Sequence, residues 1–177
     1  MNASTPWQVN LDTHCLNHAP YLASPNQDAR PAQASIDLVV IHGISLPPGQ
    51  FESRHVADLF TNQLDPRAHP YFAKVAHLKV SAHVYIQRDR QVVQFVPFDR
   101  RAWHAGVSQW QARTHCNDFS IGIELAGTDH SHYDPRQYQQ LQSILVALEQ
   151  AYPTLQPLSA HLCGHSDIAP GRKTDPG

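Results

Sequence analysis

Short apolar runs separated by polar turns predict the strands in the first part of the chain. Residues 36–41 (IDLVVI) form a β-branched run that predicts a buried strand, and this run ends directly at His42. Residues 81–86 and 91–96 are together rich in Val, Ile, Tyr and Phe. The polar residues 88–90 separate these two runs, so we expect the pair to form a β-hairpin.

Two segments predict strands in the second half of the chain. Residues 119–125 (FSIGIEL) alternate in polarity, and successive side chains of a strand point to opposite faces of the sheet. One face would carry Ile121 and Ile123, and the other would carry Ser120, Gly122 and Glu124. Residues 159–164 (SAHLCG) predict one more short strand.

Helical spacing of apolar residues predicts two helices. Residues 55–64 (HVADLFTNQL) place Val56, Leu59, Phe60 and Leu64 on one side. Asp134 and Pro135 predict the start of a longer helix, because Asp is a good N-cap and Pro suits the first turn. This second helix ends at Tyr152-Pro153, and its predicted apolar stripe is Tyr138, Leu141, Ile144, Leu145 and Leu148.

The order of these elements predicts the fold class. Strands mixed with helices indicate an α/β domain in which helices cover a central sheet, and the length of 177 residues favours one domain over residues 1–177. Residues 1–35 lack sustained periodicity, so we expect an irregular arm packed on that domain. Residues 47–49 (PPG) and the Pro- and Gly-containing residues 166–177 predict loops.

Composition excludes several classes of function. The net charge of −2 without a long basic run argues against a nucleic-acid partner. The three cysteines, Cys15, Cys116 and Cys163, lie far apart, which argues against a disulfide scaffold and an all-thiolate zinc site. The N-terminal residues lack a basic stretch followed by an apolar core, so we expect a soluble, cytoplasmic protein without membrane contact.

Histidines at strand ends are the first candidates for chemistry. His42 follows a predicted buried strand and precedes a loop, which is where α/β proteins place ligands, although a hydrogen-bonded structural histidine would fit the same position. His161 and His165 are four residues apart, which on a strand separates them by roughly 13 Å, so only one of them could reach a given ion. We prefer His165 because it lies nearer the loop. Cys163 is a rival ligand that we interpret as a small core residue.

Charged residues near the same strand ends complete a candidate site. Lys173 and Asp175 lie in an extended context, where residues two apart point the same way, but a solvated surface pair is the plainer interpretation. Glu124 lies between apolar neighbours, and burial would raise its pKa and suit it to act as a general base. The alternative is a salt-bridged or exposed carboxylate at the strand end, which would have no catalytic role. Two histidines and one carboxylate make a credible three-ligand zinc set with an open fourth position.

Five segments give the chain a resemblance to a known family. They are VVIHGISLPPGQF (39–51), LDPRAHPYF (64–72), VSAHVYIQRDRQVVQFVPFDRRAWHAGVS (80–108), CNDFSIGIELAGTD (116–129) and GHSDIAPGRKTDPG (164–177). Together they resemble the type-two N-acetylmuramoyl-L-alanine amidases, and within that family the branch that acts on 1,6-anhydro sugars in cell-wall recycling. The resemblance implies a mixed central β-sheet covered by α-helices, as in amidases and peptidoglycan-recognition proteins.

The resemblance also assigns roles to residues. It implies a Zn²⁺ site made by His42, His165 and Asp175, with Glu124 as general base and Lys173 as electrostatic helper. The implied substrate is an anhydro-muropeptide, cut at the amide between the lactyl group of 1,6-anhydro-N-acetylmuramic acid and L-alanine, by a protein that we expect to be a monomer. In the segment RAWHAG, Trp103 is expected to form an aromatic wall of the site. His83 and His104 are interpreted as structural residues.

Departures from the family pattern concern substrate contacts and the chain end. Gly43 stands where the family usually has Asn after the first ligand, and Lys79 and His115 stand at positions of two arginines that help to hold substrate carboxylates. Lys keeps the charge but loses bidentate geometry, and His can be neutral at pH 7. Family members usually continue past the final Pro-Gly. If the molecule ends at Gly177, fraying near the terminus would weaken metal binding at Asp175; the alternative is that the sequence is a piece of a longer protein.

Two other functions fit parts of the pattern. One is a lytic amidase that acts on intact peptidoglycan, and the other is a non-catalytic peptidoglycan-recognition module. Such modules tend to lose metal ligands, whereas this chain keeps a complete set. The expected function is therefore zinc-dependent amide hydrolysis.

Overall fold

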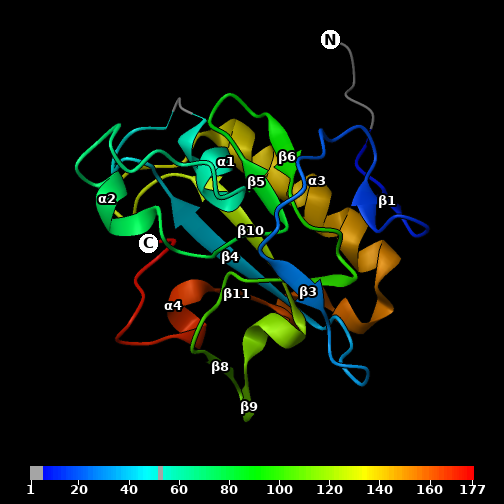
Figure 1. Ribbon diagram of the computed structural model, residues 1–177. Helices are drawn as coiled ribbons and strands as arrows, with labels where there is room; N and C mark the ends of the chain where they lie inside the picture. Colours follow the sequence, from blue (N-terminus) through cyan, green and yellow to red (C-terminus); the bar gives the residue numbers. More distant parts are fainter. Residues whose placement is uncertain (1–5, 52–53) are drawn as a thin grey trace.

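A five-stranded sheet in the order β11-β4-β10-β5-β6 forms the centre of the protein in the computed structural model, which describes residues 6–51 and 54–177 (Figure 1). The strands are β4 (Leu38–Ile44), β5 (Val84–Ile86), β6 (Val92–Gln94), β10 (Ser120–Ala126) and β11 (Leu162–Gly164). Strands β11, β4, β10 and β5 run parallel, and β6 is antiparallel to β5. The sheet is therefore mixed, as expected.

The pairing register of the two central strands, β4 and β10, sets which of their residues lie side by side. They pair from Leu38↔Ser120 to Ile44↔Ala126, so that His42 lies directly beside Glu124. The predicted strand over residues 36–41 is wrong at both ends, because pairing with β10 continues to Ile44 and begins only at Leu38. His42 is thus a residue within the strand, near the edge where the parallel strands end.

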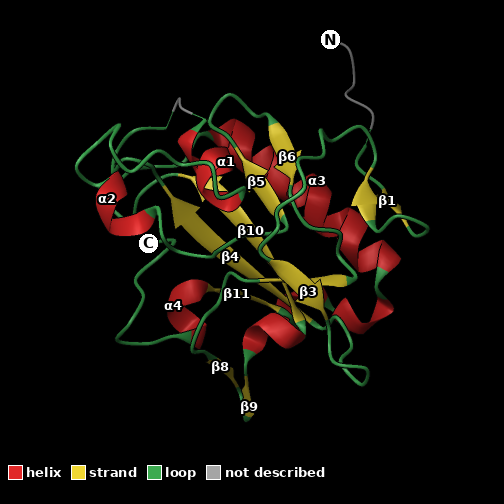
Figure 2. Cartoon of the chain, in the orientation of Figure 1, coloured by secondary structure: helices red, strands yellow, loops and turns green. Residues whose placement is uncertain are grey.

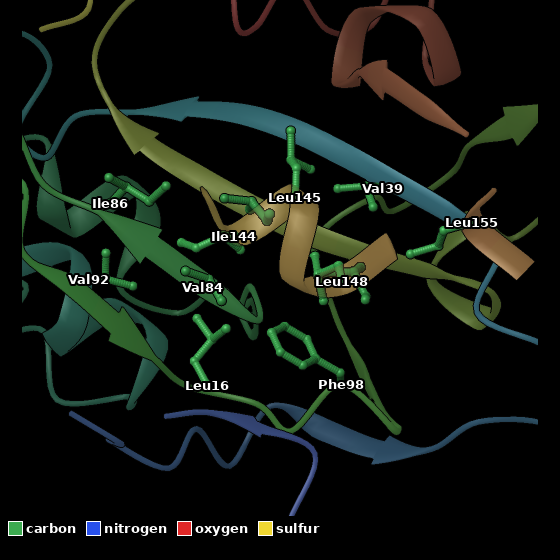
Figure 3. Packing of buried hydrophobic residues seen from close by; sticks show 12 residues of the cluster. Leu16, Val39, Val84, Ile86, Val92, Phe98, Ile144, Leu145, Leu148 and Leu155 are labelled. Carbon is green, nitrogen blue, oxygen red and sulfur yellow. The ribbon is translucent and has the colours of Figure 1, made fainter. Parts of the chain in front are cut away.

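One face of the sheet is covered by α3 (Pro135–Ala151). The predicted start is confirmed: the Asp134 carboxylate accepts a hydrogen bond from Arg136 N, and the Gln137 side chain accepts one from Asp134 N. Apolar residues of α3 pack against those of β4, β5 and β10 in one core cluster (Figure 3). That cluster includes Val39, Val84, Ile86, Ile121, Ile123, Ile144, Leu145 and Leu148.

The predicted apolar stripe of α3 is wrong at its first residue. Tyr138 is 54% exposed, whereas the neighbouring Gln137 is fully buried. The Gln137 amide donates to Ile86 O and Ala126 O at the ends of β5 and β10. Two strand-end carbonyls need hydrogen-bond partners there, so a polar residue takes the inward position.

The opposite face of the sheet is covered by α1 (His55–Phe60), α2 (Phe72–Val75) and α4 (His165–Ile168), so that helices lie on both sides of the strands (Figure 2). The helix predicted over 55–64 ends early, at Thr61, because Asn62 takes a left-handed conformation with φ of 59°. Leu64 is buried beyond the helix end. The short helix α4 was missed, since the sequence predicted only a loop from residue 166.

The N-terminal arm is more regular than predicted. It contains β1 (Val9–Asn10), β2 (Cys15–Leu16) and β3 (Gln27–Ala29), and β3 pairs with β7 (Arg100–Ala102). The Arg30 guanidinium anchors the arm by donating to four backbone carbonyls, those of Phe98, Asn117, Asp118 and Ser120. The interpretation as an irregular segment is wrong for these strands: β1 and β2 pair with each other as a short local hairpin, and β3 pairs with a strand far away in sequence. Residues 1–5 of the arm lie outside the described part.

The remaining elements are short connections. Strands β8 (Gln109–Trp110) and β9 (Arg113–Thr114) form a small hairpin, and three 3-10 turns cover Cys116–Asp118, Pro153–Leu155 and Leu158–Ala160. The predicted hairpin of β5 and β6 is confirmed, with Arg90 in a left-handed conformation that replaces a turn glycine. None of the helices in the described segments has the length and apolar character needed to cross a membrane.

Candidate functional site

Two imidazoles and one carboxylate converge where the parallel strands end. His42 comes from β4, His165 follows β11 directly, and Asp175 comes from the C-terminal loop. His42 Nδ1 lies 2.9 Å from His165 Nδ1, and Asp175 Oδ2 lies 3.1 Å from His165 Nδ1 and 3.5 Å from His42 Nδ1. Across residues 6–51 and 54–177 these three form the one group of His, Cys, Asp and Glu able to hold a metal ion.

The geometry of the three donors fits a tetrahedral ion. Ligand atoms at 2.0–2.1 Å from zinc are about 3.3–3.4 Å apart in a tetrahedron, close to the three separations here. Both imidazoles point Nδ1 towards the other donors of the group and Nε2 towards a hydrogen-bond partner outside it. His42 Nε2 lies 2.9 Å from His104 Nδ1, and His165 Nε2 lies 3.4 Å from Ala105 O. The donor set therefore fits a tetrahedrally coordinated metal ion.

The protonation states also suit a metal ion. Burial lowers the pKa of His42 to about 4, so its imidazole is neutral at pH 7. Burial acts to raise the pKa of Asp175, but hydrogen bonds and charge interactions with His165 and His42 together outweigh it and hold that pKa well below its ordinary value. A neutral imidazole and an ionised carboxylate are the forms that bind metal ions.

Glu124 lies beside this group with an unusual environment. Its side chain is buried, and Oε2 has no hydrogen-bond partner among the described residues. Burial raises the pKa of Glu124 to about 8, the charge of Asp175 adds to this rise, and Lys173 opposes it. A carboxyl group with a pKa near neutrality can take up and release a proton at physiological pH, which is what general-base catalysis needs.

A cavity of about 460 Å³ opens over these residues. One part is lined by the polar side chains of His42, His104, Glu124, His165, Lys173 and Asp175. Another part is lined by apolar side chains from the face that carries α1 and α2, namely Leu46, Leu59, Phe60, Tyr71, Val75, Leu78 and Val80. The site thus joins a charged reaction centre to an apolar surface that can bind a substrate.

Three residues expected to contact substrate are not among those that line this cavity, and their contact with substrate stays a prediction. Lys79 and His115 are exposed, and neither lines the cavity. The Trp103 indole donates a hydrogen bond to Asp28 Oδ1 at 3.2 Å and does not line the cavity either. Asp28 in turn pairs with Arg101.

The structure places both of the alternative ligands considered from the sequence, His161 and Cys163, outside the candidate metal site. His161 turns its Nδ1 towards Asp37 O, outside the metal-binding group. Cys163 is buried in a core cluster with Leu38 and Val40, which confirms its interpretation as a core residue. Because β11 ends at Gly164 and α4 begins at His165, strand alternation does not continue from Cys163 to His165.

Sequence reasoning missed Tyr133. Its ring lies over Gly43 and Gly127, where an added Cβ would come within 2.3 Å and 2.1 Å of the tyrosine side chain. The Tyr133 hydroxyl donates to Pro176 O at 2.9 Å, next to the candidate ligand Asp175. Gly43, noted only as a departure from the family pattern, is thus a residue whose missing side chain makes room for Tyr133.

Fold and site together define the class of the protein. A mixed α/β sheet with a metal-binding His-His-Asp group and a buried carboxyl group of raised pKa is the arrangement of a hydrolase that activates water. The sequence pattern of the N-acetylmuramoyl-L-alanine amidase family matches residues 32–177. The chain belongs to this family, and it is an enzyme of that amidase type.

Relatives agree with this assignment over most of the chain. The 1,6-anhydro-N-acetylmuramyl-L-alanine amidase AmpD of Escherichia coli (strain K12) is 56% identical over 154 residues, which cover 87% of this chain and 82% of that protein. A crystal structure of a selenomethionine derivative of AmpD is similar, with 54% identity, a TM-score of 0.90, and coverage of 95% and 92% of the two chains. A complex of the E. coli amidase AmiD with the substrate anhydro-N-acetylmuramic acid-L-Ala-D-gamma-Glu-L-Lys is 30% identical, with a TM-score of 0.55 and coverage of 84% and 56%.

Proposed function

We propose that this enzyme hydrolyses the amide between the lactyl group of 1,6-anhydro-N-acetylmuramic acid and the L-alanine of its peptide, and that it uses zinc. The observation that carries the proposal is the convergence of His42, His165 and Asp175 beside the buried Glu124. The names of the AmpD relatives, and the anhydro-muropeptide bound to AmiD, support the substrate class. A role in cell-wall recycling in the cytoplasm is part of the same proposal.

Zinc held by the three ligands would supply Lewis-acid polarisation of the lactyl carbonyl and would acidify a water molecule from a pKa of 15.7 towards roughly 7. His42, His165 and Asp175 would hold the ion and leave one position open. The neutral state of His42 and the ionised state of Asp175 favour this binding without further proton release.

Glu124 would move the proton. Its carboxylate takes a proton from the attacking water as the new C–O bond forms, and it gives that proton to the leaving nitrogen as the C–N bond breaks. The products are a sugar with a free lactyl carboxylate and a peptide with a free amino group. Lys173, which lines the same cavity, would stabilise the negative charge that develops on the carbonyl oxygen.

Mass spectrometry of the products tests this proposal directly. A 1,6-anhydro-muropeptide incubated with zinc-loaded protein should give two products whose masses sum to the substrate plus one water. A matched incubation with Glu124→Gln should give far less of both products over the same time. Intact substrate after incubation with folded, zinc-loaded protein would overturn the proposal, and release of peptide from intact sacculi at an equal rate would favour a lytic amidase instead.

A further inference from the structure

We propose that His104 and Ser120 are positioning residues that fix the tautomer of His42, so that His42 Nδ1 faces the metal with a free lone pair. This inference rests on the metal site proposed above. It concerns a hydrogen-bonded chain of four groups that runs from the metal-binding group into the protein, from His42 through His104 and Ser120 to the carbonyl of Cys116.

The far end of the chain sets the direction of every hydrogen bond. Ser120 Oγ lies 2.6 Å from Cys116 O, and a carbonyl oxygen can only accept, so the single hydroxyl proton of Ser120 points to Cys116. Ser120 Oγ must then accept from His104 Nε2, which lies 3.1 Å away. His104 therefore carries its proton on Nε2.

The near end follows from the same reasoning. In a neutral imidazole protonated on Nε2, Nδ1 is an acceptor. His104 Nδ1 lies 2.9 Å from His42 Nε2, so His42 donates from Nε2 and keeps its own Nδ1 unprotonated. That bare nitrogen is the atom that lies near His165 Nδ1 and Asp175 Oδ2. In the opposite tautomer of His42, the lone pairs of His42 Nε2 and His104 Nδ1 would face each other at 2.9 Å.

The surroundings of His104 are built to hold its ring in this place. Asn117 Oδ1 accepts hydrogen bonds from both His104 N and Ala105 N, at 3.1 Å and 2.8 Å. The ring lies on Gly122, where an added Cβ would come within 2.4 Å of His104 Cγ. Ser120 and Gly122 thus share one face of β10, with Ser120 orienting the ring and Gly122 leaving room for it.

The two histidine ligands differ in what supports them. The outer nitrogen of His165 lies near a backbone carbonyl, Ala105 O, which no substitution removes. The outer nitrogen of His42 meets a side chain, His104. Removal of a side chain that hydrogen-bonds to a metal ligand typically weakens metal affinity by about 10- to 100-fold. The support of His42 can therefore be tested by substitution.

Nitrogen NMR of the metal-free protein tests the tautomers. Long-range ¹H–¹⁵N correlation should give both His42 and His104 the pattern of an imidazole protonated on Nε2. In Ser120→Ala the orienting hydroxyl is lost, and His104 should show a mixture of tautomers. A wild-type His42 protonated on Nδ1 would overturn the proposal.

Zinc affinity, measured by competition with a chromophoric chelator, gives the second readout. His104→Leu removes the acceptor for His42 and should bind zinc about 10- to 100-fold more weakly. His104→Asn retains an acceptor oxygen near the position of Nδ1 and should recover most of the affinity. His161→Gln is the control for loss of a histidine outside the site and should bind like the wild type.

The outcomes separate this inference from the proposed function. Unchanged zinc affinity in folded His104→Leu and Ser120→Ala would overturn the positioning role while leaving the metal site intact. A wild-type protein that binds no zinc would overturn the metal site itself. If His104→Leu fails to fold, Ser120→Ala carries the test, because it removes only one hydroxyl group and should still weaken zinc binding.

Discussion

At the scale of single residues, the environment of Glu124 decides whether it can act as a base. Its buried carboxyl group lies beside His42 in the sheet register and near Asp175, so its pKa rises to about 8 while that of Asp175 falls. Two carboxyl groups at one site thus take different protonation states, because Asp175 lies within hydrogen-bond distance of His165, whereas Glu124 Oε2 has no hydrogen-bond partner among the described residues. One can serve as ligand and the other as base.

We expect Glu124→Gln to lower turnover by about 10²- to 10⁴-fold, the usual contribution of a general base. The amide has a similar size but cannot accept the proton from water. Steady-state kinetics on an anhydro-muropeptide measures the loss, with zinc content determined on the same samples as control. Turnover at the wild-type rate would remove Glu124 from the mechanism.

The same substitution should change the pH dependence of stability in metal-free protein. Between pH 4.5 and about 8 the folded protein keeps a proton on Glu124 that the unfolded chain has lost. The free energy of unfolding should therefore fall as pH rises through this window, by up to about 1.4 kcal/mol per pH unit. Gln cannot ionise, so the difference in stability between Glu124→Gln and wild type should grow with pH in denaturant titrations. Parallel pH profiles would contradict the raised pKa.

Tyr133 acts at the same scale on the C-terminal ligand. Tyr133→Phe removes the hydrogen bond to Pro176 O, whose loss is worth about 1 kcal/mol. We expect zinc affinity to fall by up to about fivefold, since the segment that carries Asp175 is held less firmly. Tyr138→Phe, at an exposed tyrosine whose ring contacts Tyr133, is the matched control and should bind zinc like the wild type. Equal affinities for all three proteins would mean that Tyr133 does not hold the ligand.

At the scale of elements, β10 combines packing and chemistry in one strand. Its face towards α3 carries Ile121 and Ile123 in the core cluster. Its other face carries Glu124, which lines the cavity, and Ser120 and Gly122, which lie against His104. Strand alternation enforces this division, so the chemistry of one face can vary without loss of the core on the other. The helix α3 supports the site from behind.

We expect Asp134→Ala to lower the free energy of unfolding by about 1 kcal/mol, because it removes the N-cap of α3. The cap lies outside the residues that line the cavity, so activity per folded molecule should not change. Urea denaturation measures the stability, with Asp12→Ala at an exposed position as control. A loss of turnover without a loss of stability would contradict the role of Asp134 as a helix cap.

At the scale of the whole molecule, Asp175 links the C-terminal loop to the sheet through its contacts with His42 and His165. A ligand that binds only the folded state stabilises it by RT ln(1 + [L]/Kd), about 2.7 kcal/mol at 100 times Kd. Since the three residues come together only in the fold, we expect chelation of zinc to lower Tm. Added zinc should restore Tm, which should rise with the logarithm of the free zinc concentration above Kd. Calorimetry in the presence and absence of chelator measures the shift. A Tm independent of zinc would contradict a folded-state site.

The sequence by itself determined what depends on neighbours along the chain. Alternation in residues 119–125 placed Glu124 opposite the isoleucines, Asp134 and Pro135 marked the start of α3, and family segments indicated the ligand set. The first two features follow from backbone geometry and local hydrogen bonds, whereas the ligand set is what the resemblance to the family implies. Tertiary structure alone decided which contacts form between distant segments: that the Nδ1 atoms of His42 and His165 meet, that His104 supports His42, that Tyr133 lies on Gly43, and that Gln137 replaces Tyr138 on the inner side of α3. Such contacts depend on pairing and burial across the whole fold, and no local pattern encodes them.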